Sequence, residues 1–153
     1  MLRNSIPEAL RAALKEQDKP CISTVRLIMA ALKDRDIAAR GKGDTEGISD
    51  GEILQMLQTM VKQRRESIQM YEKGGRKELA EQEAKEITII ERFLPQQLDE
   101  KHINTIVEKT INEIGADSLK DMGHVMSELR NNYAGQMDFS KASGLVKEKL
   151  SNS

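Results

Sequence analysis

The sequence predicts an all-α protein, and two observations carry this prediction. Leu, Ala, Met, Glu, Lys, Gln and Arg, which favour helices, dominate the 153-residue chain, whereas aromatic residues make up only 3% of it. No run of residues alternates between apolar and polar in the way that is typical of a half-buried strand. We therefore expect a helical N-terminal domain with a long antiparallel hairpin, followed by a small three-helix C-terminal domain.

Four helices are expected in the N-terminal domain, residues 1–94. Ser5 and Ser49 each head a capping box, and apolar residues follow them at helical spacing. The third and fourth helices are separated by Gly74-Gly75, which implies a tight antiparallel hairpin. The expected bounds are about 5–17, 18–40, 50–73 and 76–93.

Pro95 marks the expected domain junction, because proline cannot continue a helix and moves the preceding residue out of the α region. We take residues 95–98 as a linker and residues 99–153 as a three-helix tail domain. Asp99 and Ser140 are expected to cap two of its helices. The expected helices cover about 99–114, 119–132 and 141–150.

Composition limits the functional classes. The net charge is −1: residues 1–95 carry 17 Lys and Arg against 16 Asp and Glu, and residues 96–153 carry 7 against 9. Any contact with nucleic acid must therefore use a local basic patch. One cysteine, Cys21, excludes an intrachain disulfide and a cysteine-based zinc site, and the two histidines have no neighbouring ligands. We expect no metal, no cofactor and no catalytic constellation.

The chain has no apolar stretch long enough to span a bilayer and no apolar core of a signal peptide at its N-terminus. The acidic residues near the N-terminus argue against a transit peptide. We therefore expect a cytoplasmic protein without a membrane partner.

Arg64 is the most informative single residue, because it falls on the apolar face of the third helix. A guanidinium there is costly unless it is paired. Counting from the Gly-Gly turn, we expect Arg64 to pair with Glu83 on the fourth helix, with Glu86 as the second candidate. Such a pair either fixes the helix register or lines a groove for a charged partner group.

Basic residues form rows on two helices. Those on the second helix recur every seven residues, and those around the third helix and the hairpin tip point outward. Such rows bind phosphates, but many are solvated faces with local salt bridges. The candidate binding residues are Arg26, Lys33, Arg40, Lys62, Arg64, Arg65 and Arg76.

Two turns are the candidate binding elements of the tail. Gly123, like Gly144, lies within a short helix, where glycine costs about 1 kcal/mol relative to alanine and suggests a close backbone approach, either within the domain or to a partner. Gly135 and Gln136 belong to a turn beside a helix N-terminus, where backbone N–H groups attract anions, although such a turn is more often a plain interhelical connection. The candidates are Gly123, His124, Gly135 and Gln136.

Several short segments, spread in order along the chain, share one family pattern. They are Ser23-Thr24-Val25-Arg26-Leu27-Ile28, Ala30-Ala31-Leu32-Lys33, Val61-Lys62-Gln63-Arg64-Arg65-Glu66-Ser67-Ile68 with Tyr71, Gly75-Arg76 with Leu79-Ala80 and Glu83, Phe93-Leu94-Pro95 with Gln97-Leu98, Met122-Gly123-His124-Val125-Met126, Gly135 and Asp138.

With these segments, the chain resembles the stand-alone YqeY proteins of the GatB/YqeY family. The resemblance implies a helical domain with a three-helix tail, similar to the C-terminal part of GatB, a subunit of tRNA-dependent amidotransferase. In GatB that region engages tRNA, while the chemistry occurs in other domains. The family's basic residue after Gly135 is replaced here by Gln136, and its lysine after Gly123 by His124, so the tail loses positive charge.

The resulting hypothesis is a non-catalytic accessory module of aminoacyl-tRNA metabolism that binds tRNA or a tRNA-handling enzyme, such as an aminoacyl-tRNA synthetase or amidotransferase subunits. One alternative is a protein–protein adaptor without RNA contact. The other is a carbon-nitrogen ligase component that uses glutamine as amido-N-donor and is active only within a complex.

Overall fold

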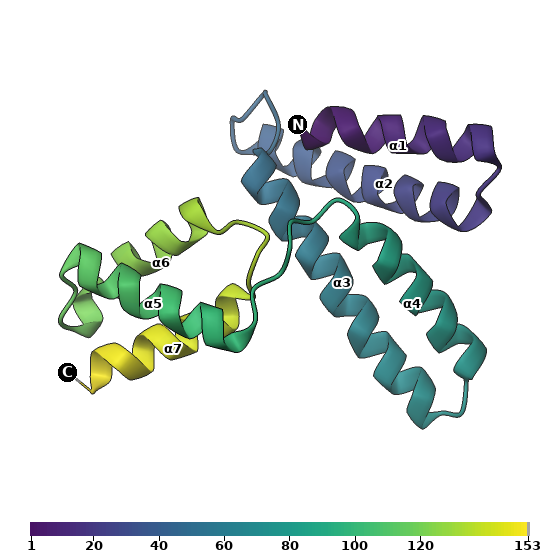
Figure 1. Ribbon diagram of the computed structural model, residues 1–153. Coiled ribbons are helices and arrows are strands. Elements are labelled where there is room, and N and C mark those ends of the chain that lie inside the picture. The colour runs from purple at the N-terminus through teal and green to yellow at the C-terminus, as the bar shows by residue number, and fades with distance from the viewer. Residues whose placement is uncertain (153) are drawn as a thin grey trace. The chain divides into compact units, whose positions relative to one another are not determined.

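The computed structural model describes residues 1–152, and within them it contains α-helices and one 3₁₀ turn but no strand (Figure 1). The all-α prediction is therefore confirmed. The chain divides into two compact units, Met1–Pro95 and a second one that begins at Gln96. Within residues 1–152, no helix is both long and apolar enough to cross a bilayer.

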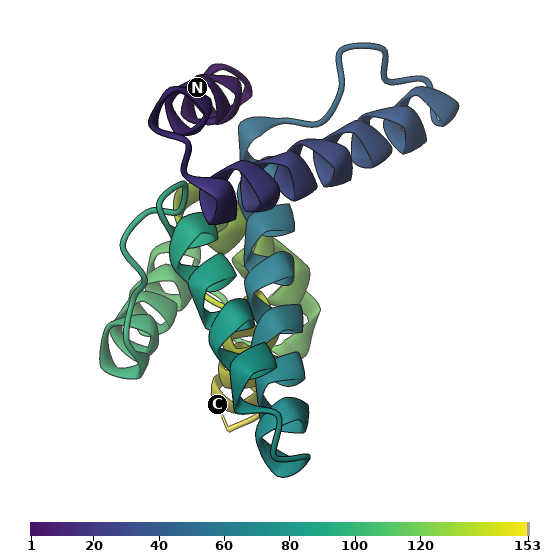
Figure 2. The same cartoon turned by 90° about the vertical axis from the view of Figure 1, so that its right-hand side faces the viewer.

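Unit 1 consists of two antiparallel helix pairs. Helix α1 lies along α2, and α3 and α4 form a long hairpin that lies side by side in both views (Figures 1 and 2). Helix α2 also packs on α4, which joins the two pairs. The helices are α1 (Leu2–Glu16), α2 (Lys19–Gly41), α3 (Asp50–Lys73) and α4 (Lys77–Glu91).

The core of unit 1 is aliphatic, as the helical spacing of its apolar residues predicts. All four helices contribute side chains that are almost completely buried. The largest are Ile6, Val25, Ile28, Ile53, Met56, Leu57 and Ile90.

Unit 2 is a three-helix arrangement with its own core. Each of its three α-helices packs against the other two. Gln97 and Leu98 belong to this unit, because they donate hydrogen bonds to the carbonyl oxygens of Gly135 (2.6 Å) and Gln136 (2.9 Å). The elements are α5 (Glu100–Ile114), the 3₁₀ turn η1 (Leu119–Asp121), α6 (Met122–Asn132) and α7 (Phe139–Ser151), and the core is built on Val107, Val125, Leu129, Met137, Ala142 and Val146.

Local capping signals predicted some helix starts correctly and others incorrectly. The Ser49 capping box and the Asp99 cap are confirmed. The Ser5 capping box is wrong, because α1 begins at Leu2 and the Ser5 hydroxyl instead donates to the carbonyl oxygen of Met1. The expected helix at 119–132 opens with a 3₁₀ turn, and α7 starts earlier than expected because Asp138, rather than Ser140, caps it.

A bidentate ion pair connects three segments of unit 1. The guanidinium of Arg3 in α1 donates to both carboxylate oxygens of Asp36 in α2, at 2.8 and 2.7 Å, and to the carbonyl oxygen of Ile48 at 2.8 Å. The N–H of Ile48 also donates to Asp36, at 2.9 Å. We call this arrangement the Arg3–Asp36 clamp. It ties α1 and α2 to the loop that leads into α3.

The clamp makes stability depend on pH. The hydrogen bonds from Arg3, aided by the Ile48 N–H, hold the pKa of Asp36 at about 2, below its ordinary 3.8. A lowered carboxyl pKa adds stability above the unfolded-state value, and that stability is lost as the pH falls from about 4 to 2. The Arg3 side chain is 37% exposed, so solvent screening reduces this contribution to about 1 kcal/mol.

We predict that Asp36→Asn lowers the free energy of unfolding by about 1 kcal/mol at pH 7, and that the difference from wild type shrinks towards pH 3. Urea unfolding at a series of pH values measures both quantities. Asp34→Asn is the matched control, because Asp34 is an exposed carboxylate on the same helix. A pH-independent difference would contradict the assignment.

Gly47 is the glycine that the clamp requires. Its φ is +88°, and a Cβ there would lie 2.5 Å from Nη2 of Arg3 and 2.6 Å from Oδ1 of Asp36. Gly43 has a similar φ of +95°, but a Cβ there would meet nothing within 4 Å. An alanine at Gly43 would therefore add backbone strain alone, whereas an alanine at Gly47 would add both strain and steric overlap with the clamp.

We predict that Gly43→Ala costs about 1 kcal/mol of stability, which is the backbone term alone. Gly47→Ala is expected to cost about 1 kcal/mol more, because the clamp must open. Chemical unfolding of the two variants tests this, and equal losses would show that Gly47 is not crowded by the clamp.

Candidate functional site

Arg64 lies inside the α3–α4 hairpin with its side chain only 14% exposed. Its Nε donates to Oε2 of Glu86 at 2.9 Å, and its Nη1 donates to the carbonyl oxygen of Met60 at 3.2 Å. The carboxylate of Glu83 is farther away, with its Oε2 4.0 Å from Nε. The closer partner is thus Glu86, which we had placed second.

Both expected partners thus form an ion pair with Arg64, and helix register explains why Glu86 is the closer one. Arg64 precedes Gly74 by ten residues and Glu86 follows Gly75 by eleven, whereas Glu83 follows it by only eight. Equal distances from the turn place two residues at the same height along an antiparallel hairpin, because each residue adds about 1.5 Å of rise.

The two carboxylates neutralise the guanidinium and repel each other. Burial raises the pKa of Glu83, the negative charge of Glu86 raises it further, and Arg64 opposes both effects. Since one cation already faces two carboxylates, this site does not attract a phosphate. The geometry favours the structural interpretation of Arg64, in which the cluster holds the hairpin in register.

We predict that Arg64→Met lowers the free energy of unfolding by about 2–3 kcal/mol at pH 7, because two half-buried carboxylates lose their cation. The loss should be smaller near pH 5. Burial and the charge of Glu86 raise the pKa of Glu83, and protonation of Glu83 at lower pH removes the repulsion between the two carboxylates. Urea unfolding at both pH values measures the effect.

Adding Glu83→Gln and Glu86→Gln to Arg64→Met should restore most of the loss, because no buried charge then remains. Arg65→Met is the matched control, since the Arg65 side chain is 64% exposed. A similar loss in the control, or no recovery in the triple variant, would contradict the structural role of Arg64.

The other basic candidates of the hairpin are exposed. Arg65 contacts Glu91 at 3.8 Å and Arg76 contacts Glu78 at 3.4 Å, in ion pairs that solvent screens. Lys62 is exposed and takes part in none of the ion pairs found in residues 1–152. Local pairing thus involves the three arginines Arg64, Arg65 and Arg76 of this hairpin.

The row on α2 differs in this respect. Arg26, Lys33 and Arg40 are exposed and form no ion pair or hydrogen bond within the part of the chain that the structure describes. Seven residues are close to two helical turns, so successive cations lie about 10 Å apart on one face. We call these three residues the basic row of α2.

Two members of this row border a groove of about 280 Å³ between α1 and α2. Its walls are largely apolar, and Lys33, Arg40 and Asp36 are the charged residues among those that line it. The lining residues are Ile6, Pro7, Met29, Leu32, Lys33, Asp36, Ile37 and Arg40.

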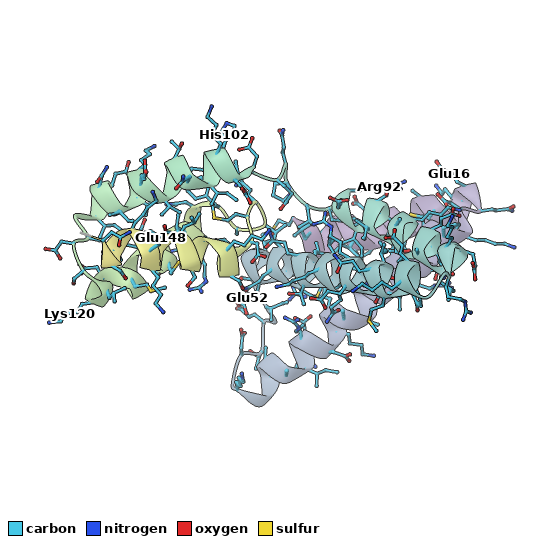
Figure 3. The ribbon with its side chains drawn as sticks, turned by 90° about the horizontal axis from the view of Figure 1, so that it is seen from below. Glu16, Glu52, Arg92, His102, Lys120 and Glu148 are labelled. Atoms are coloured by element: carbon cyan, nitrogen blue, oxygen red, sulfur yellow. The ribbon has the colours of Figure 1, made fainter. Side chains whose placement is uncertain are left out.

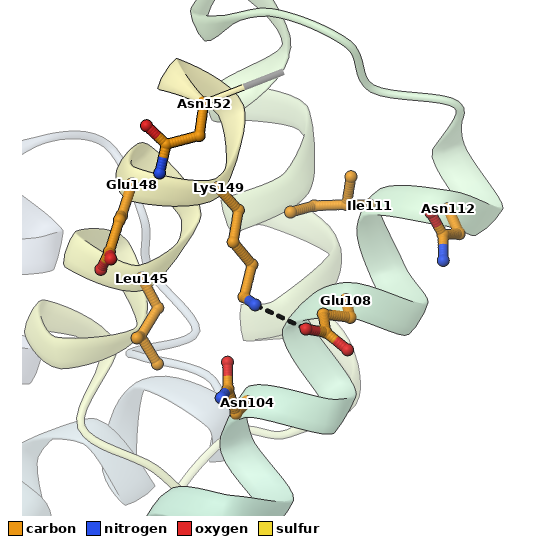
Figure 4. Close-up of a pocket in the computed structure, with 8 residues that line it drawn as sticks. All are labelled: Asn104, Glu108, Ile111, Asn112, Leu145, Glu148, Lys149 and Asn152. Carbon is orange, nitrogen blue, oxygen red and sulfur yellow. Dashed lines mark hydrogen bonds and ion pairs between the residues drawn. The ribbon is translucent and has the colours of Figure 1, made fainter.

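Two larger grooves have an acidic lining. The one between α2 and α4, of about 390 Å³, has three glutamates against two lysines. The one in unit 2, of about 550 Å³, lies between α5 and α7, where Lys149 pairs with Glu108 at 2.7 Å (Figure 4). Glu148 adds a second carboxylate there, and no candidate residue from the sequence lines this groove. Neither groove suits an anion.

The tail turns do not have the geometry that we expected. A Cβ added at Gly123 or Gly144 would meet nothing within 4 Å, so the interpretation as a close backbone approach is wrong within residues 1–152. The N–H of Gln136 donates to the carbonyl oxygen of Tyr133, and the carbonyl of Gly135 accepts from Gln97.

The start of α7 is also unsuited to an anion. The N–H of Ser140 donates to the carboxylate of Asp138 at 2.9 Å, which places a negative charge at the position that a phosphate would need. His124 is exposed. The tail candidates thus lack an open cluster of donors.

In unit 2, charged side chains project outward, as the labelled Lys120 does (Figure 3). Among residues 1–152, no three His, Cys, Asp or Glu side chains gather in a way that could hold a metal ion. Cys21 is a free, buried thiol at the start of α2.

Sequence comparison assigns the chain to a family. A family model described as Yqey-like protein matches residues 3–150. The chain belongs to this family. The resemblance noted from short segments is thereby confirmed.

Curated relatives of this YqeY-like chain come from fungi. A Lachancea thermotolerans protein named "Altered inheritance of mitochondria protein 41, mitochondrial" is 26% identical over 111 residues, which cover 68% of this chain and 57% of that protein. A Clavispora lusitaniae protein of the same name is 28% identical over 137 residues, with 87% and 76% covered. An uncharacterized Schizosaccharomyces pombe protein is 26% identical over 95 residues, with 62% and 73% covered.

The names of these relatives contradict the cytoplasmic location that we expected. The proteins from Lachancea, Vanderwaltozyma polyspora and Clavispora are all named as mitochondrial. This chain spans 57% of the length of the first two.

Proposed function

We propose that this YqeY-like chain is a non-catalytic accessory module of aminoacyl-tRNA metabolism, and that it binds tRNA through the basic row of α2. One observation carries the proposal: Arg26, Lys33 and Arg40 share one exposed helix face and form no ion pair or hydrogen bond within residues 1–152. Free cations at regular spacing neutralise backbone phosphates without reading sequence.

The charge around the row supports this proposal. Asp36 is the carboxylate in the adjoining groove, and the Arg3–Asp36 clamp already neutralises it. The hairpin cluster of Arg64, Glu83 and Glu86 carries a net negative charge, and the acidic grooves repel phosphate. A phosphate backbone therefore has its best electrostatic partner along α2.

The non-catalytic part of the proposal is supported by how the perturbed carboxylates are used. Asp36 holds Arg3, Asp99 caps α5, and Asp121 accepts from the Asp117 N–H. These carboxylates owe their shifted pKa to hydrogen bonds with other groups of the protein. A catalytic carboxylate must instead be accessible to a substrate. The family resemblance to the tRNA-engaging end of GatB supplies the link to tRNA.

We predict that the chain binds unfractionated tRNA with an affinity that falls steeply with salt. Three phosphate contacts give a slope of about −2.7 in log K against log salt, or a loss of about 40-fold between 50 and 200 mM. Fluorescence anisotropy with labelled tRNA measures this slope.

Replacing Lys33 by Ala should reduce the slope by about one contact. The matched control is Lys15→Ala, an exposed lysine on α1 that lies outside the basic row. If tRNA does not bind at low salt, the proposal is wrong, and the result favours the alternative of a protein–protein adaptor without RNA contact. If the two variants lose equally, the basic row is not the site.

A further inference from the structure

The groove between α1 and α2 has an unusual apolar wall for an exposed surface. Ile37 on α2 is 54% exposed, although it is a large aliphatic residue next to the half-buried Met29 and Leu32. Ile6 and Pro7 on α1 complete the apolar lining. From residue 29 to residue 40 the groove follows α2 for about 16 Å, or three helical turns.

The net charge along this wall is positive, because its one carboxylate, Asp36, is paired with Arg3. Lys33 and Arg40 are two turns apart on its edge and form no ion pair or hydrogen bond within residues 1–152, although the charge of Arg40 helps to lower the pKa of Asp36. Asp36 does not offset them, because both of its oxygens accept from Arg3 and one also accepts from the Ile48 N–H. The groove thus combines an apolar floor with two cations that form no ion pair within residues 1–152.

The apolar floor and the two cations indicate which kind of ligand fits the groove. A nucleic-acid base would stack on aromatic side chains, and none lines the groove. An amphipathic helix instead lays apolar side chains at i, i+4 and i+7 into such a groove. Two carboxylates seven residues apart on that helix would lie about 10 Å apart, which is the separation of Lys33 and Arg40 along α2.

We propose that the α1–α2 groove binds an acidic amphipathic helix of a partner protein, with its apolar side chains against Met29, Leu32 and Ile37 and its carboxylates on Lys33 and Arg40. This interaction requires no RNA and does not rest on the proposed tRNA binding. Because it uses two of the three cations of the basic row, the peptide and tRNA would compete.

The test uses the full chain and a synthetic helical peptide of about four turns. The peptide is built on Ala and Gln, with Leu at i, i+4 and i+7 and two Glu seven residues apart at the edge of the Leu face. Anisotropy of the labelled peptide should show saturable binding with a Kd of about 10–100 μM. A peptide with Lys in place of both Glu should bind at least about tenfold more weakly.

Variants locate the site and separate it from RNA binding. Ile37→Ser should weaken peptide binding about tenfold and leave tRNA binding almost unchanged. Arg26→Ala should weaken tRNA binding and spare the peptide, because Arg26 does not line the groove. Leu27→Ser is the matched control for Ile37, since Leu27 is a 45% exposed aliphatic residue on α2 outside the groove.

Three results would overturn the proposal. They are no binding of the acidic peptide, equal binding of the acidic and lysine peptides, and equal effects of the Ile37 and Leu27 substitutions. Circular dichroism of each variant confirms that the fold is retained. The tRNA titration is read separately, so either activity can fail while the other holds.

Discussion

The carboxylate of Asp36 accepts hydrogen bonds from the Arg3 guanidinium and the Ile48 N–H, which come from segments on either side of it in the chain. One side chain in the middle of α2 thereby fixes the position of α1 and the path of the loop into α3. The same contact removes a negative charge from the exposed side of α2. The contact of α1 with α2, the path of the loop into α3 and the local charge of this face of α2 therefore all involve one ion pair.

The Arg64 cluster shows the opposite use of a buried charge. One guanidinium lies between the carboxylates of Glu83 and Glu86, so its charge is consumed inside the hairpin. Such an arrangement aligns α3 and α4, because a shift by one turn would leave a half-buried charge without its partner. The apolar seam around Arg64 is thus compatible with a purely structural guanidinium.

The residues proposed to bind a partner therefore lie on α2, on the outer side of the α1–α2 pair, and not on the α3–α4 hairpin. Membership of the YqeY-like family is shown by a match to residues 3–150. In the part of the chain that the structure describes, some of the exposed and half-buried cations form ion pairs and others do not. The hairpin cations Arg64, Arg65 and Arg76 form ion pairs with carboxylates, whereas the residues of the basic row of α2 form none within residues 1–152. That contrast supports a role in which α2 meets a negatively charged partner.

Much of the fold could be predicted because it depends on local signals. Apolar spacing, the caps at Ser49 and Asp99, and the breaks at Gly74-Gly75 and Pro95 act over a few residues, and the helices follow them closely. The capping predictions that failed also relied on local signals, but other hydrogen bonds replaced the expected caps. Ser5 has the form of a cap, yet its hydroxyl bonds back to Met1 within a longer helix, and Asp138 caps α7 in place of Ser140.

The sequence by itself determined the helical class, the helix order and the family, because these depend on spacing and on short motifs. Only the tertiary structure decided which charges are neutralised. Arg3 and Asp36 are 33 residues apart, and the choice between Glu83 and Glu86 depends on how two packed helices are aligned. Sequence patterns specify which face of a helix a charge occupies, whereas its partner is set by packing distances of a few ångströms between helices.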